Sequence, residues 1–149
     1  MCTVSGTSIS AGSDTNFSSS IDATQIGMDF DSSANKVVIA YVVNQSGHSD
    51  LLAGKAVVGT VSGTSISFGS TTTFVVGIGS GSVYAGTTTV SYDSTNNKSI
   101  IFYDESDANL KRVVGTVSGT SISFDTSVLL LSGNKGYIKS DYDSTNDTA

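Results

Sequence analysis

The chain has 149 residues, of which 38% are hydrophobic and only 13% are charged, and its formal net charge is −6. Seven basic against thirteen acidic residues form no basic stripe, so we expect neither a nucleic acid nor an anionic membrane surface as a partner. The single cysteine, Cys2, excludes an internal disulfide framework, and no apolar run reaches the length of a membrane-spanning helix. Few Lys, Glu and Leu beside many Ser, Thr, Val and Ile favour short strands over helices.

Nearly identical phrases divide the chain at regular intervals. The twelve residues VVGTVSGTSISF occupy both 57–68 and 113–124, and a shorter copy, TVSGTSIS, occupies 3–10. Successive copies are 57 and 56 residues apart. Self-similarity at a fixed period of this length indicates a repeat architecture in which each unit is one supersecondary element.

In chain order, each unit begins with an expected strand A and a turn. Strand A alternates apolar and polar residues, at 26–30 in the first full unit and at 88–92 in the second, which is the period of a strand. The turn reads Asp-Ser-x-x-Asn-Lys, at 31–36 and at 93–98. Asp, Ser and Asn side chains favour such turns because they satisfy their own local backbone.

Three further strands, B to D, complete each expected unit. Strand B is a nearly continuous apolar run, which predicts burial on both faces. Strands C and D flank a Ser-Gly-Thr turn, in which Gly63 or Gly119 supplies the positive φ that a tight hairpin needs. The expected bounds are 37–41, 57–61 and 65–68 in the first full unit and 99–103, 113–117 and 121–124 in the second. The segments between strand D and the next strand A, including 69–87, are expected to be connections.

Four short antiparallel strands repeated at a fixed period are typical of β-propeller blades. We therefore predict an all-β propeller of about 56-residue blades, with a β-solenoid as the alternative. The expected units are a partial blade with strands C and D (1–14), two full blades (15–70 and 71–126) and a partial blade with strand A around 138–142 (127–149).

Two full blades cannot close a ring, and open ends expose strand edges. We expect two chains to complete one ring, because closed symmetry is the usual outcome for homo-oligomers. Strand A of one chain would join strands C and D of the other in a hybrid blade without strand B. Four full and two hybrid blades would then form a six-bladed homodimer. The alternative is that the chain is a segment of a longer repeat protein.

The connections predict where a ligand would bind. In an up-down-up-down blade, the A–B and C–D turns lie on one face, and these are the nearly identical phrases. The B–C and D–A connections lie on the other face and differ between units in length and sequence. Since binding residues usually lie in loops on a rigid scaffold, the candidate ligand-binding residues are those of the variable face. They are Asn44, His48, Asp50, Tyr84, Asp104, Glu105, Asp107 and Arg112.

We find no catalytic constellation and expect no metal or cofactor. His48 is the only histidine and has no second soft ligand for zinc. Asp104, Glu105 and Asp107 are better explained as a solubilising loop than as an acid/base pair or a calcium site. Asp29 either lines a central channel or has a hydrogen-bonded structural role.

The phrases VGTVSGTSISFG and YDSTNNK resemble tandem repeats in phage tail-fibre-like and surface proteins of marine microbes. The resemblance covers nearly the whole chain and implies a propeller with a binding or adhesion role, extracellular or on a virion surface. It carries over no site residues. The expected function is a non-catalytic binding module, with a glycan as the candidate ligand. A glycoside hydrolase or lyase, and a structural spacer without a ligand, are the alternatives.

Overall fold

The computed structural model describes residues 2–19, 23–44, 52–78, 88–104, 109–133, 138–146 and 148. This part of the chain contains twelve β-strands and no helix, so the predicted all-β class is confirmed.

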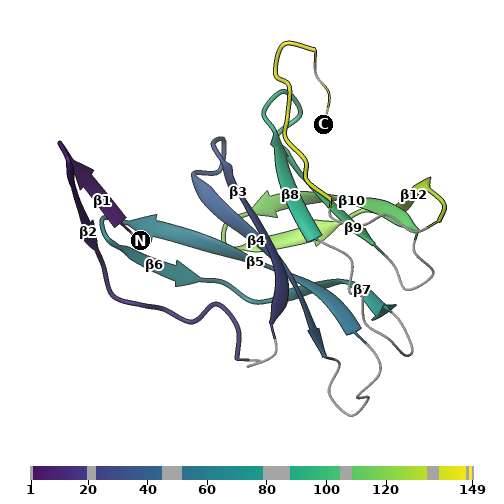
Figure 1. Ribbon diagram of the computed structural model, residues 1–149, viewed down its shortest axis with the longest axis horizontal. Helices are drawn as coiled ribbons and strands as arrows, with labels where there is room; N and C mark the ends of the chain where they lie inside the picture. The colour runs from purple at the N-terminus through teal and green to yellow at the C-terminus, as the bar shows by residue number, and fades with distance from the viewer. Residues whose placement is uncertain are drawn as a thin grey trace.

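The strands form one hairpin and two five-stranded sheets (Figure 1). The hairpin consists of β1 (Cys2–Ser5) and β2 (Ser8–Ala11). The first sheet contains β3 (Thr24–Asp31), β4 (Lys36–Asn44), β5 (Leu52–Ser62), β6 (Ser65–Phe68) and β7 (Thr72–Ile78). The second sheet contains β8 (Thr88–Asp93), β9 (Lys98–Asp104), β10 (Leu110–Ser118), β11 (Ser121–Phe124) and β12 (Val128–Leu131).

Both sheets have the order predicted for strands A to D, and every neighbouring pair is antiparallel. The first runs β3-β4-β5-β6 and the second β8-β9-β10-β11. We call the edges formed by β3 and β8 the inner edges, and those formed by β6, β7, β11 and β12 the outer edges.

The outer edge differs from the prediction, because the expected connection 69–87 contains a strand. β6 pairs with residues 59–62 of β5, and β7 pairs with residues 52–56 of the same strand. β5 is eleven residues long, so its first half would expose unpaired backbone groups if the chain left the sheet after β6. β12 extends β11 along β10 in the same way.

The predicted strand A at 138–142 is also wrong as a strand. These residues belong to no strand, and the residues after them form a turn closed by an isolated bridge between Asp143 and Thr148. β3 is held by hydrogen bonds to β4, whereas 138–142 has no strand B beside it among the described residues.

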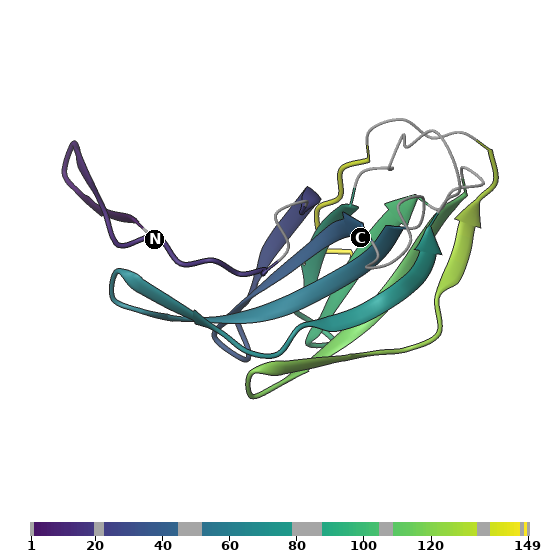
Figure 2. The same cartoon turned by 90° about the horizontal axis from the view of Figure 1, so that it is seen from below.

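The two sheets pack face to face, and β1–β2 projects from one side of the stack (Figure 2). Val38 and Ala40 of β4 lie in one cluster with Ile101 and Tyr103 of β9, and all four are almost completely buried. The opposite face of β4 is buried beneath Phe17. Strand B of the first sheet is therefore buried on both faces, as predicted.

The turns also follow the predicted chemistry. Asp31 Oδ1 accepts hydrogen bonds from the backbone amides of Ser33, at 3.0 Å, and Ala34, at 2.9 Å. Gly63 has a φ of 57° and Gly119 a φ of 61°, as a two-residue hairpin loop requires.

Candidate functional site

The strand ends define two ends of each sheet. The turn end carries the A–B turns (31–36 and 93–98) and the C–D turns (62–65 and 118–121). The loop end is where β4 and β9 finish and where β5 and β10 begin, since Asn44 pairs with Leu52 and Asp104 with Leu110. The antiparallel register thus brings together the strand ends that carry the variable connections.

Three of the predicted site residues lie in strands. Asn44 is the last residue of β4, Asp104 is the last residue of β9, and Arg112 lies in β10. Asp104 is buried and Arg112 is half-buried. The other candidates lie outside the described residues and stay predictions: His48, Asp50, Tyr84, Glu105 and Asp107.

Asp104 and Arg112 share one face of the second sheet, the outer face that points away from the first sheet. Asp104 pairs with Leu110, and Arg112 pairs with Phe102 on the same two strands. The repeat counterparts of Asp104 and Arg112 are Val42 and Ala56, both buried in the first sheet. The outer face of the second sheet therefore carries a carboxylate and a guanidinium where the first sheet is apolar.

No group of three or more His, Cys, Asp or Glu side chains that could hold a metal ion occurs within the described ranges. None of the residues that the structure describes forms a helix able to cross a membrane.

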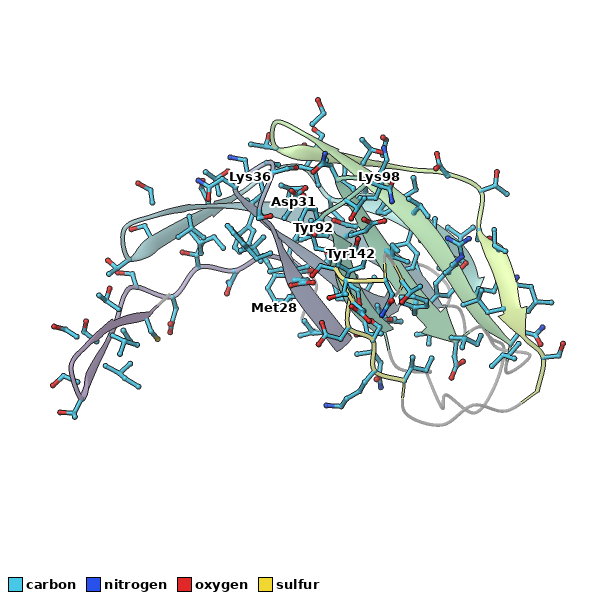
Figure 3. All side chains as sticks on the ribbon, turned by 90° about the horizontal axis from the view of Figure 1, so that it is seen from above. Met28, Asp31, Lys36, Tyr92, Lys98 and Tyr142 are labelled. Atoms are coloured by element: carbon cyan, nitrogen blue, oxygen red, sulfur yellow. The ribbon has the colours of Figure 1, made fainter. Side chains whose placement is uncertain are left out.

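At two successive junctions a tyrosine hydroxyl forms a hydrogen bond with the A–B turn of the preceding unit, and Figure 3 labels both tyrosines. The hydroxyl of Tyr92 accepts a hydrogen bond from the backbone amide of Ser33, at 3.2 Å, in the turn of the unit before it. The hydroxyl of Tyr142 donates to Thr95 Oγ1, at 2.7 Å, in the turn of the unit before that tyrosine. Since Thr95 is the repeat counterpart of Ser33, one tyrosine contact joins each unit to the preceding one.

Residues 138–142 accordingly lie beside β8 much as β8 lies beside β3. The hydroxyl of Ser91 donates to Ser140 Oγ at 2.6 Å. Asp29 of β3 is the repeat counterpart of Ser91. Between β3 and β8, its carboxylate accepts a hydrogen bond from the Tyr92 amide at 2.7 Å. Asp29 thus has the structural role that was one of its two predicted roles.

Aromatic side chains repeat at the faces between units. The ring centroids of Phe17 and Tyr41 are 5.1 Å apart, and those of Phe74 and Tyr103 are 5.3 Å apart. Phe74 also packs edge-on against Phe124, at 5.6 Å. Phe17 therefore contacts the first sheet as Phe74 of the first sheet contacts the second.

Near the outer edge, Gly12 and Gly69 each meet the C–D turn of the next unit. A Cβ on Gly69 would overlap the carbonyl oxygen of Thr120 and lie 2.9 Å from its Cβ. Gly12 has the same relation to Thr64, again with 2.9 Å to the threonine Cβ. Only glycine allows this approach.

These junction residues are not among those predicted from the sequence. The repeat pattern predicts Tyr92 only as part of strand A, and Phe17 and Phe74 only as parts of connections. Phe17 and Phe74 are 57 residues apart, the interval between the first two copies of the repeated phrase. Extending the search for the repeat into the connections would have found them.

Asp93 begins the second A–B turn, and its carboxylate holds that turn together. Its Oδ1 accepts hydrogen bonds from the backbone amides of Thr95, at 3.0 Å, and Asn96, at 2.8 Å, and its Oδ2 accepts one from the Asn96 side chain, at 2.9 Å. Desolvation raises the pKa of Asp93, but the hydrogen bonds from Asn96, Tyr142 and Thr95 together lower it below its ordinary value of 3.8.

Replacing Asp93 by asparagine is expected to lower the free energy of unfolding at neutral pH by about 1 kcal/mol, because a neutral acceptor replaces a charged one. Since the folded-state pKa is depressed, the contribution of the charged form is present above the unfolded-state pKa and is lost as the pH falls through the folded-state pKa. The difference between the urea unfolding curves of wild type and variant should therefore begin to shrink below about pH 4 and disappear only below the folded-state pKa.

Asp143→Asn is the matched control for this measurement. The Asn146 side chain and then the Thr145 amide lower the pKa of Asp143, but its turn lies outside both sheets. Its replacement should reduce stability less than Asp93→Asn does. A loss at Asp93 that stayed constant down to acid pH would contradict the role given to its charge.

A comparison of the chain with protein-family models, with curated proteins and with solved structures found no match.

Proposed function

We propose that the two sheets are blades of a β-propeller and that the protein is a non-catalytic binding or adhesion module, extracellular or on a virion surface. The observation that carries the fold proposal is the repetition of junction contacts. Tyrosine, phenylalanine and glycine residues at equivalent repeat positions each contact the equivalent part of the neighbouring unit at two successive junctions. Similar contacts at successive junctions are expected in a ring of similar blades.

The contrast between the two ends of the sheets supports a binding role. The turn end is occupied by the repeated phrases, and its side chains are used in hydrogen bonds within the turns and between units. The loop end carries connections that differ between units. Recognition residues at the loop end can therefore vary without disturbing the contacts that hold the units together.

A glycan is the ligand class that we propose for this end. The candidate residues include amide, carboxylate and guanidinium groups, which are suited to sugar hydroxyls, and Tyr84, whose ring could stack on a sugar face. The acidic net charge argues against phosphate-rich polymers as ligands.

A glycan array tests this function. Wild-type protein is expected to bind at least one class of sugar, and Asn44→Ala or Tyr84→Ala should reduce binding tenfold or more. Lys36→Ala, at the turn end, is the control and should bind as wild type does. Binding to no sugar would remove the carbohydrate proposal and favour the spacer. Cleavage of a bound glycan that is lost when Asp104, Glu105 and Asp107 are neutralised would instead favour the hydrolase or lyase.

We propose further that a second copy of the chain completes the ring, giving six blades with twofold symmetry. In support, large apolar side chains are exposed at both ends of the stack, which is unfavourable in water unless something covers them. They are Val4, Ile9, Ile26, Met28 and Phe30 on the first side and Leu129, Leu130 and Leu131 in β12 on the other.

A further inference from the structure

The free side of β3 carries an apolar row whose counterpart on β8 is covered. Ile26, Met28 and Phe30 are 52%, 62% and 47% exposed. Their repeat counterparts on β8 are Thr88, Val90 and Tyr92, which are 5%, 5% and 7% exposed. The counterparts are buried in the junction where β3 packs beside β8. The row on β3 is thus the same docking face, but no strand A among the described residues lies against it.

The segment 138–142 offers the matching surface, since no described strand lies on its side away from β8. Ser140 points to β8, while Lys139 and Asp141 are exposed on the other side. Asp141 Oδ1 accepts a hydrogen bond from the next amide at 2.8 Å, as Asp29 Oδ1 does at 2.7 Å. Residues 138–142 therefore share a local hydrogen bond with β3, although they form no ladder.

The two surfaces cannot meet within one chain, because β8 lies between β3 and 138–142. We infer that residues 138–142 of a second copy dock on the Ile26–Met28–Phe30 row of the first copy. By twofold symmetry, residues 138–142 of the first copy dock on the same row of the second copy. This inference rests on the proposed propeller. The aliphatic stem of Lys139 would cover part of the apolar row while its ammonium group stays in water. Asp141 would face Met28 as Ser91 faces Ser140.

Away from the inner edge, the proposed interface between the two copies differs from the junction between the first and second sheets within one chain. On the outer face of the second sheet, Phe102 takes the place of Ala40 and Arg112 that of Ala56. In the proposed hybrid blade no strand B would lie against this face, and Phe102 is already only 7% exposed within one chain. The contact between the copies is therefore concentrated at the inner edge.

Asp125 supports the same conclusion at the outer edge. It is the repeat counterpart of Gly69, and its amide donates to Val114 at 3.0 Å as that of Gly69 donates to Val58. A side chain at this position excludes the close approach that Gly69 makes to Thr120. The C–D turn of a second copy must stand farther from Asp125 than Thr120 stands from Gly69.

Cysteine cross-linking tests this contact. In a Cys2→Ser background, the pair Met28→Cys and Asp141→Cys is expected to form a covalent dimer under mild oxidation, about twice 15.2 kDa on a non-reducing gel. Both positions are exposed, so neither change disturbs the core. The matched control is Ser91→Cys with Ser140→Cys, whose native hydroxyls are 2.6 Å apart and which should close within one chain.

Each result decides between the possibilities. Each single-cysteine variant should run as a monomer on the gel. A covalent dimer from Met28→Cys alone would mean that the free sides of β3 in two copies face each other, and this result would overturn the inference. A ladder of multimers would show an open head-to-tail chain and overturn the reciprocal contact. A solution mass near twice 15.2 kDa without the cross-link would overturn this contact but leave the dimer standing. A monomeric mass without the cross-link would overturn both, while the glycan array would still test the binding function.

Discussion

Alanine in place of Ile101 is expected to destabilise the folded chain by about 3 kcal/mol. Ile101 is 0% exposed and lies in the cluster that joins the two sheets, beside Val38, Ala40 and Val113. Removing its side chain leaves a cavity between two rigid sheets, which can close only partly. Chemical denaturation followed by far-UV circular dichroism measures the loss.

Ile100→Ala is the matched control for this prediction. Ile100 precedes Ile101 in β9, is half-buried and points to the outer face. Both changes replace isoleucine by alanine in one strand, so the difference between them reports burial rather than strand propensity. We expect a loss of about 1 kcal/mol at Ile100. Equal losses at the two positions would mean that the sheets do not pack against each other as described.

Aspartate in place of Gly69 is expected to cost about 2 kcal/mol, because its Cβ would overlap the carbonyl oxygen of Thr120. The backbone itself accepts aspartate here, since Asp125 makes the equivalent hydrogen bond in the second sheet. The loss should therefore come from the junction between units and not from the local turn. Thermal unfolding of Gly69→Asp beside wild type gives the measurement.

Asp125→Gly is the reverse change and the control. Asp125 is exposed, so the stability of a single chain should change by less than about 1 kcal/mol. If Gly69→Asp were as mild as Asp125→Gly, the close contact between the first sheet and the C–D turn of the second would be ruled out.

Much of the fold could be predicted because the signals are local. The aspartate of each A–B turn accepts hydrogen bonds from the backbone amides two and three residues later. All the residues of this interaction therefore lie within the repeated turn sequence. The glycines of the C–D turns need a positive φ whatever surrounds them. The apolar run of strand B likewise predicts a strand buried on both faces, which β4 confirms.

Less of the candidate site could be predicted, because it depends on register. The sequence predicts Asp104 and Arg112 in a loop, yet they lie in β9 and β10 and share one face of the second sheet. That shared face follows from the pairing of β9 with β10, which spacing alone does not determine.

The sequence by itself therefore determined the repeat unit, its four-strand order and its turns, because each depends on residues close together in the chain. Only the tertiary structure decided how the units meet. The extension of the outer edge by β7, the contact of Tyr92 with Ser33 and the approach of Gly69 to Thr120 join residues that are far apart in sequence. Such contacts form only when whole sheets pack together, so they cannot be predicted from any one short segment of the sequence.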